Sequence, residues 1–320
     1  MTHLLRKIAL FLAASTLGSA SAQADWITKT AKVEKPVKAA KAEKPAAPKL
    51  PPMRMAKPAL WKLSDADTTI YLFGTIHVLP DRIDWYRGKI ESAMRESDSL
   101  ITEIPGDEPA LVQSVVMRTA MLPKGQTLHQ LLSPEDVTLL DSILQQYQIP
   151  VAAIDPYEPW FAAIVLADYP LVRENFKAEN GVEAQLGVKS KALSQTHEGL
   201  ETIEFQLGIF DRLPRKIQLK YLHEVMVGVP GIRQELLKLV DFWAKGNVDD
   251  LAKLVNEDEQ IPEMAQALIY GRNQSWAEWI RRRMAKPGKV FIAVGAGHLA
   301  GTGSVQAYLG KMKIYATRVQ

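Results

Sequence analysis

The sequence contains no cysteine among its 320 residues. This excludes cysteine nucleophiles, thiolate metal sites, iron–sulfur clusters and disulfide bonds, as well as the cysteine-linked lipid that anchors bacterial lipoproteins. The sequence also lacks the Gly-x-Ser-x-Gly turn of many serine hydrolases and the phosphate-binding loop of P-loop NTPases. A fold without disulfides must be stabilised by packing, and its chemistry must come from residues other than cysteine.

The first 24 residues have the pattern of a secretory signal peptide. Arg6 and Lys7 precede an apolar run, and small residues follow it up to Ala24. We predict cleavage after Ala24 and a mature protein that is periplasmic or secreted. The alternative is an uncleaved anchor, although the apolar run is short and interrupted for a membrane span. No later segment resembles a transmembrane helix, so we expect no integral membrane span once the signal peptide has been removed.

Residues 25–57 are rich in lysine, alanine and proline and contain almost no large apolar side chains. Such a composition cannot offset the entropy lost on ordering, so we predict a disordered linker. A basic linker could also contact an anionic surface, although a solvated spacer is the simpler interpretation. The folded part of the chain is predicted to be a single domain spanning residues 58–320.

The net charge of the whole chain, +3, differs in sign from the net charge of this domain. Eleven of the 39 basic residues but only three of the 36 acidic residues lie before residue 59. The remaining 28 basic and 33 acidic residues give the domain a net charge of −5. A mildly acidic domain argues against a nucleic-acid-binding protein.

Strand patterns occur at both ends of the domain, and helical patterns fill its middle. We predict strands at residues 60–64, 68–78, 99–104, 191–195, 289–298 and 313–319. The first two are expected to be joined by a turn at Asp65–Asp67, and Ser133 is expected to cap a helix that begins at Pro134. The predicted fold is α/β (α+β), with a central mixed β-sheet formed from N- and C-terminal strands and surrounded by many helices.

Two of these apolar strands run into the same short motif, a glycine followed three residues later by a histidine. The stretch "YLFGTIHVLP" places His77 after Gly74, and "FIAVGAGHLAG" places His298 after Gly295. Glycine permits tight turns and the close approach of a neighbouring strand. Because ligands bind beside the carboxyl ends of the strands in such sheets, we expect His77 and His298 to face one another across adjacent strand ends.

A third apolar strand, "SLITEIP", delivers Glu103 near its carboxyl end. Two neutral imidazoles and one carboxylate are a suitable set of ligands for a divalent transition metal such as Mn²⁺, Co²⁺ or Zn²⁺, with a position left open for water. We therefore predict that His77, His298 and Glu103 bind a metal that supports hydrolysis of an amide or ester. The alternative is that each histidine bonds only a loop carbonyl and that Glu103 caps a helix or pairs with an arginine.

Several segments together resemble the TraB/PrgY/GumN family, which is related to the Tiki metalloproteases. The resemblance runs from about Leu60 to Val319 and includes "LWKLS", "IYLFGTIHVLP", "LITEI", "GVEAQL", "GLETIEFQ", "RNQSWAEWI" and "VFIAVGAGHLAG". It implies a fold of the erythromycin esterase/ChaN type and favours Mn²⁺ or Co²⁺ over Zn²⁺. It also implies that the metal-dependent peptidase site consists of His77, Glu103 and His298.

Further residues are candidates for supporting roles. Arg272 is predicted to be catalytic, holding a substrate carboxylate or stabilising an oxyanion, and the alternative is a buried ion pair with Glu103 or Glu201. Glu201 and Asn273 are predicted to lie in a second layer around the site, where Glu201 would orient a histidine or merely begin a helix. The family resemblance leads us to expect aspartate where Glu183 stands, so no role is assigned to Glu183.

The sequence thus predicts an exported metal-dependent hydrolase, specifically a peptidase with a peptide or protein substrate. Glu103 would be either a third metal ligand or the general base. The alternative function is a non-catalytic periplasmic binding protein that holds a peptide, a signal or a haem-like ligand in the same cleft. A third possibility is a structural role in envelope assembly, in which the three strand-end residues would lie apart.

Overall fold

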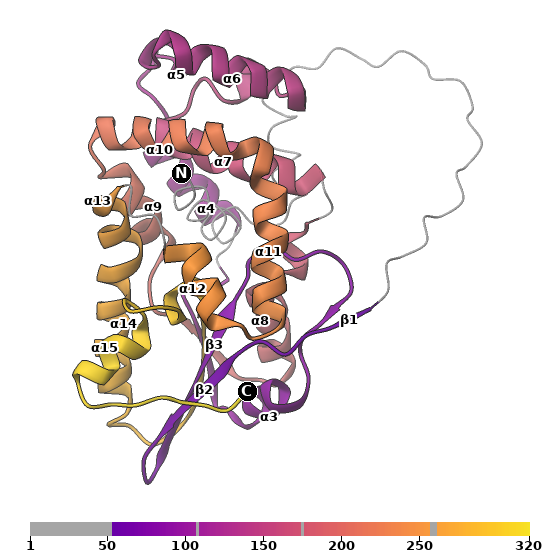
Figure 1. Ribbon diagram of the computed structural model, residues 1–320. Helices are drawn as coiled ribbons and strands as arrows, with labels where there is room; N and C mark the ends of the chain where they lie inside the picture. Colours follow the sequence, from indigo (N-terminus) through magenta and orange to yellow (C-terminus); the bar gives the residue numbers. More distant parts are fainter. Residues whose placement is uncertain (1–52, 107–108, 174–175, 257–260) are drawn as a thin grey trace.

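A computed structural model describes residues 53–106, 109–173, 176–256 and 261–320 of the protein (Figure 1). The predicted signal peptide, residues 1–24, and all but the last five residues of the predicted linker, residues 25–57, lie outside these ranges. Within them, no helix has the length and apolar character needed to cross a membrane.

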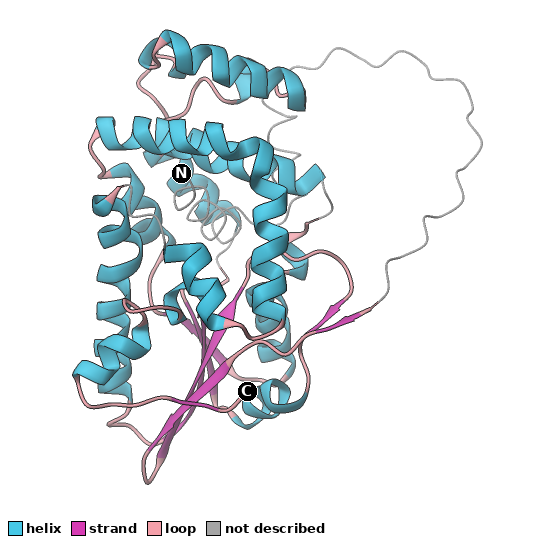
Figure 2. Ribbon diagram, viewed as in Figure 1, coloured by secondary structure: helices cyan, strands magenta, loops and turns pink. Residues whose placement is uncertain are grey.

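Within the described residues, one six-stranded mixed sheet lies below a layer of helices in the view of Figure 2. Its strands in spatial order are β6 (Thr196–Gly199), β5 (Ser99–Thr102), β7 (Gly288–Gly295), β3 (Thr68–Thr75), β2 (Leu60–Ser64) and β8 (Thr317–Arg318). Neighbours from β6 to β3 are parallel, whereas β2 is antiparallel to both β3 and β8. Strands from the two ends of the chain are therefore neighbours, which confirms the predicted mixed sheet.

The central strands are buried on both faces, as their apolar runs predict. Along β3, Tyr71 and Phe73 point into a large core under the helices, whereas Ile70 and Leu72 point into a smaller core on the opposite face. This alternation follows from the two-residue period of a strand. The smaller core is closed by α14 (Gly271–Arg283) and α15 (Val305–Lys311).

The helical middle covers the larger core. Its α-helices are α3 (Gly88–Glu96), α4 (Pro109–Thr119), α5 (Leu128–Leu131), α6 (Pro134–Tyr147), α7 (Pro159–Arg173), α8 (Val182–Ala192), α9 (Ile203–Asp211), α10 (Arg215–Gly228), α11 (Ile232–Ala244), α12 (Val248–Asn256) and α13 (Pro262–Ala265). Short helical turns are η1 (Val151–Ala153), η2 (Ala178–Asn180), η3 (Val229–Gly231), the π-helical η4 (Gln266–Tyr270) and η5 (Ala296–Leu299). In Figure 1 helices α5 and α6 form the layer farthest from the sheet.

Local signals predicted several of these boundaries correctly. The backbone N–H of Thr68 donates to the side chain of Asp65 at 2.9 Å, which fixes the predicted turn between β2 and β3. The hydroxyl of Ser133 accepts from the N–H of Asp136 at 3.1 Å and caps α6, which begins at Pro134. Side-chain capping and a proline in the first turn are strong enough to define a helix start without tertiary context.

The strand predicted at residues 191–195 is wrong. Lys191 and Ala192 end α8, and the strand is β6, Thr196–Gly199, one residue beyond the predicted segment. β6 lies at the edge of the sheet and alternates exposed with half-buried residues, so it lacks the apolar run that marks a central strand.

A second, two-stranded sheet pairs β1 (Arg54–Met55) with β4 (Ile83–Asp84) and lies outside the main sheet.

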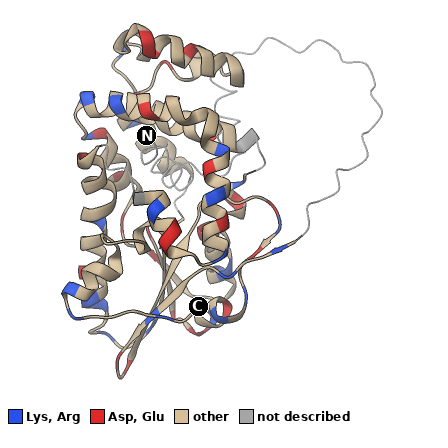
Figure 3. Cartoon of the chain, viewed as in Figure 1, with Lys and Arg blue, Asp and Glu red and all other residues tan. Residues whose placement is uncertain are grey.

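Charged residues of both signs occur on the described helices (Figure 3). Helix α12 carries Asp249 and Asp250 in its first turn and Lys253 in its last, and the last turn of α14 contains Arg281, Arg282 and Arg283. This distribution follows the helix dipole, which favours acids near the start of a helix and bases near its end.

Candidate functional site

The two glycine–histidine motifs meet at one edge of the sheet. β3 and β7 are parallel neighbours, with Thr75 opposite Gly295, so both strands end side by side. A Cβ on Gly74 would lie 3.0 Å from the Cα of Ala296, so the missing side chain allows the chain after β7 to pass close to β3. The histidines follow the strands instead of lying within them, because β3 ends at Thr75 and His298 lies in η5.

Glu103 reaches the same edge from the next strand. It follows β5 directly and is 3% exposed. Its Oε1 accepts a hydrogen bond from the backbone N–H of Gly295 at 2.7 Å, and its Oε2 accepts from Arg272 at 2.6 Å and from Gln206 at 3.2 Å. His298 Nε2 lies 3.9 Å from Oε1. The carboxylate thus bonds the end of β7 on one side and residues of α14 and α9 on the other.

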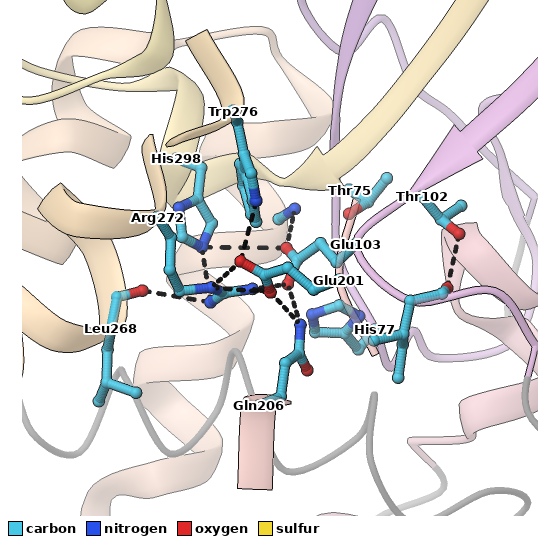
Figure 4. Close-up of polar contacts among 12 residues, drawn as sticks. Thr75, His77, Thr102, Glu103, Glu201, Gln206, Leu268, Arg272, Trp276 and His298 are labelled. Atoms are coloured by element: carbon cyan, nitrogen blue, oxygen red, sulfur yellow. Dashed lines mark hydrogen bonds and ion pairs between the residues drawn. The ribbon is translucent and has the colours of Figure 1, made fainter. Parts of the chain in front are cut away.

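Arg272 is the cation at the centre of this group (Figure 4). The guanidinium donates from Nη2 to Glu103 and Glu201, and from Nε to both oxygens of Glu201 at 3.0 and 3.1 Å. Its Nη1 lies 3.1 Å from the carbonyl of Leu268 in η4 and 3.3 Å from His298 Nε2. These contacts occupy all five N–H groups of the side chain. The ion-pair alternative predicted for Arg272 is therefore the arrangement present.

We call His77, Glu103, Glu201, Arg272 and His298 the strand-end cluster. His77, Glu103, Arg272 and His298 are buried, and the side chain of Glu201 is 6% exposed. Burial raises the pKa of Glu103, but the charges of Arg272, His298 and His77 and the N–H of Gly295 hold that pKa far below its ordinary value. Burial lowers the pKa of Arg272, and the two carboxylates more than restore it. The cluster therefore keeps charged groups in a site with little solvent.

His298 is held with a defined tautomer. Its Nδ1 lies 2.6 Å from Oδ1 of Asn273, whose amide nitrogen donates to the carbonyl of Gly303 at 2.7 Å. An amide oxygen only accepts, so Nδ1 carries the proton and Nε2 keeps the lone pair. Burial, the charge of Arg272 and the nearby His77 lower the pKa of His298 to about 3. His298 is therefore a neutral imidazole at ordinary pH.

His77 is held in the corresponding way by Glu183. Its Nδ1 lies 2.8 Å from Oε1 of Glu183, which also accepts a hydrogen bond from the hydroxyl of Thr75. Burial lowers the pKa of His77, but the charges of Glu183 and Glu103 outweigh burial and raise it overall. When the ring is neutral, the proton on Nδ1 leaves the lone pair on Nε2.

Glu201 supports Arg272 and the neighbouring indole. Besides the guanidinium, it accepts from Nε1 of Trp276 at 2.9 Å and from Gln206 at 3.0 Å. The Trp276 ring packs against His298 with 4.5 Å between ring centroids. The partners of Glu201 are thus an arginine, an indole and an amide, and Asn273 is the predicted supporting residue that contacts a histidine directly.

The two histidines share one feature with metal ligands, a side-chain acceptor on Nδ1. Each imidazole bonds a side-chain acceptor through Nδ1, which is the arrangement that orients metal-bound histidines and leaves Nε2 as the donor atom. Among the described residues, however, no three His, Asp or Glu side chains are arranged so that they could share a metal ion. Arg272 occupies hydrogen-bonding positions of both Glu103 and His298, so a metal would have to displace some of its contacts.

Three contributors to the site were not identified from sequence: Thr75, Glu183 and Gln206. Gln206 lies in α9 and donates to Glu103 and Glu201, but a glutamine in an amphipathic helix carries no signal of its role. Glu183 is the second residue of α8, and only the close approach of that helix start to His77 shows its partner.

These features describe an α/β protein with a buried histidine–carboxylate–arginine cluster at the carboxyl ends of adjacent parallel strands. The family model described as TraB/PrgY/gumN matches residues 59–318, and the chain belongs to this family. Similar relatives include the proteins named uncharacterized protein YbaP in Escherichia coli (strain K12) and Shigella flexneri, each 25% identical over 244 residues, which cover 75% of this chain and 87% of the relative. An uncharacterized protein of Treponema pallidum (strain Nichols) is 23% identical over 276 residues, covering 79% of this chain and 80% of the relative. No solved structure matches the chain.

Proposed function

We propose that the protein is an exported metal-dependent hydrolase that cleaves peptide bonds at the strand-end cluster. The observation that supports this proposal is the matched setting of His77 and His298. Both are buried, both follow adjacent parallel strands, and both bond a side-chain acceptor through Nδ1. Histidines that bind a metal almost always bond a side-chain or backbone acceptor through the other ring nitrogen, as these two do.

His77 and His298 would hold the metal through their Nε2 atoms, and Glu103 would supply the carboxylate. Mn²⁺ or Co²⁺ is favoured by the family resemblance, and Zn²⁺ also suits these donors. When bound, such a metal acts as a Lewis acid on the carbonyl of the scissile bond. The resemblance to metal-dependent peptidases indicates a peptide or protein as the substrate.

The remaining residues of the cluster would set the charge and geometry of the site. Arg272 keeps Glu103 ionised and fixed in position through its 2.6 Å bond. Because every N–H of Arg272 is engaged, we propose that it positions Glu103 and His298 instead of binding an oxyanion directly. Asn273 would hold the His298 ring so that Nε2 keeps its lone pair, to which Arg272 donates until a metal displaces it.

The test is cleavage of a peptide library by protein loaded with Mn²⁺, Co²⁺ or Zn²⁺. We expect cleavage that a chelator suppresses and that His298→Ala abolishes. His223→Ala is the matched control, because His223 is a half-exposed residue of α10 that pairs with Asp136 away from the cluster. Metal binding without any cleavage would instead support the alternative, a periplasmic binding protein for a peptide, a signal or a haem-like ligand.

A further inference from the structure

Glu183, to which the sequence assigned no role, makes the side-chain contact with His77. Its Oε1 accepts hydrogen bonds from Nδ1 of His77, at 2.8 Å, and from the hydroxyl of Thr75. Thr75 is fully buried and His77 nearly so, whereas the side chain of Glu183 is 20% exposed. Among the described residues, the second oxygen of Glu183, Oε2, is buried without a hydrogen-bond partner. A buried carboxylate oxygen without a partner is costly and calls for a reason.

The backbone around Glu183 is built to bring it to His77. Gly181 precedes α8, and a Cβ there would overlap the carbonyl oxygen of His77. The N–H of the next residue, Val182, donates to the carbonyl of Ile76 at 3.0 Å. The start of α8 is therefore fixed against the chain that leaves β3, and the first turn of the helix presents Glu183 to the ring.

We propose that Glu183 is a positioning residue that sets the tautomer and the orientation of His77. A carboxylate accepts hydrogen bonds and donates none, so its partner Nδ1 must carry a proton. Thr75 donates to the same oxygen and keeps the carboxylate from turning away. The ring is then held with its Nε2 lone pair available, as Asn273 holds His298. The catalytic consequence rests on the proposed function, whereas the tautomer does not.

The tautomer can be measured directly by long-range ¹H–¹⁵N NMR of ¹⁵N-histidine-labelled, metal-free protein at a pH where His77 is neutral. We expect wild-type His77 to show protonated Nδ1 and bare Nε2. Glu183→Ala removes the acceptor, so we expect a mixture of the two tautomers, whereas Glu183→Asp, and Glu183→Gln with an amide oxygen that can accept as that of Asn273 does, should keep much of the wild-type signal. His298 is the internal control, because its partner Asn273 is unchanged. Bare Nδ1 in the wild type, or an unchanged His77 signal in Glu183→Ala, would overturn the proposal.

Metal titration provides the second measurement and separates the two proposals. Loss of such a supporting partner weakens metal affinity by about 10–100-fold. We expect a loss in that range for Glu183→Ala, a smaller loss for Glu183→Asp, and none for Glu204→Ala, which changes an exposed acid in the first turn of α9. A wild-type protein that binds no metal would contradict the proposed function, while the NMR result would still decide the role of Glu183. Wild-type affinity in Glu183→Ala would count against the positioning role alone.

Discussion

Nη2 of Arg272 lies 2.6 Å from Oε2 of Glu103, and both side chains are almost completely buried. Removing one partner of a buried ion pair leaves an uncompensated charge, which costs about 3–5 kcal/mol. We predict that Arg272→Ala lowers the free energy of unfolding by about this amount, because it leaves both Glu103 and Glu201 unpaired. Chemical denaturation followed by circular dichroism measures the change.

Arg281→Ala is the matched control for this prediction, since Arg281 lies on the same helix, α14, in an exposed pair with Glu278. Exposed pairs contribute little, and we expect a change of less than about 1 kcal/mol. Equal effects of the two substitutions would show that the buried cluster does not contribute to stability as described.

Gly181 is predicted to be intolerant of any side chain. In Gly181→Ala the added Cβ would overlap the carbonyl oxygen of His77, so the start of α8 must move away from β3. We expect a loss of at least about 1–3 kcal/mol in the free energy of unfolding, the usual cost of overpacking. Gly310→Ala in α15 is the control, because nothing beyond its chain neighbours and its own helix backbone lies within 4 Å of the added Cβ. Its stability should stay within about 1 kcal/mol of wild type, and a Gly181→Ala protein as stable as this control would contradict the described packing.

His129 is predicted to stabilise the fold in a pH-dependent way. Its Nδ1 lies 2.6 Å from Asp155 and its Nε2 lies 3.1 Å from Asp141. Burial lowers the pKa of His129, but these two carboxylates outweigh burial and raise it above 6.5. A raised pKa in the folded state means that the contribution is complete below the unfolded pKa and is lost as pH rises through the folded pKa.

The difference in unfolding free energy between wild type and His129→Gln should therefore be largest in mild acid and should shrink in alkaline solution. His197→Gln provides the opposite case, because burial lowers the pKa of His197, so its contribution weakens as pH falls. Denaturation at a series of pH values tests both, and a His129 effect that is independent of pH would contradict the ion pairs.

Asn273 is predicted to matter for metal binding because it fixes His298. Asn273→Ala removes the acceptor 2.6 Å from Nδ1 and frees the ring to change tautomer. We expect metal affinity to fall by about 10–100-fold. Calorimetric titration with Mn²⁺ or Co²⁺ measures the change, and Ser275→Ala on the exposed side of α14 is the control. An Asn273→Ala protein with unaltered affinity would show that the Nδ1 contact does not support metal binding.

The parts of the fold that could be predicted from sequence are those with a local signal. The apolar runs of β3 and β7 identify central strands, and two parallel central strands necessarily end at the same edge. Strand alternation continued past Gly295 predicts His298 on a strand, whereas the chain turns after Gly295 and His298 lies in the helical turn η5. The edge strand β6 was misplaced since its polar sequence has no apolar face.

The residues that hold the site in place do so through tertiary contacts, and the sequence predicts only some of these residues. Arg272 and Glu201 were identified as a possible ion pair because charged residues rarely occur unpaired inside a protein. The role of Glu183 could not be predicted, because nothing in the sequence of α8 shows that Gly181 lets the start of this helix contact the end of β3. The role of Gln206 could not be predicted either, because its two carboxylate partners, Glu103 and Glu201, come from different segments of the chain.

The metal content of the purified protein tests the central claim most directly. Wild type, His77→Ala, His298→Ala and the control His223→Ala would be purified without added metal, checked by circular dichroism and measured by elemental analysis. We predict a stoichiometric divalent transition metal in wild type and control, and its loss in both of the other variants while the fold is retained. If His77→Ala and His298→Ala keep as much metal as wild type, these two histidines are not its ligands.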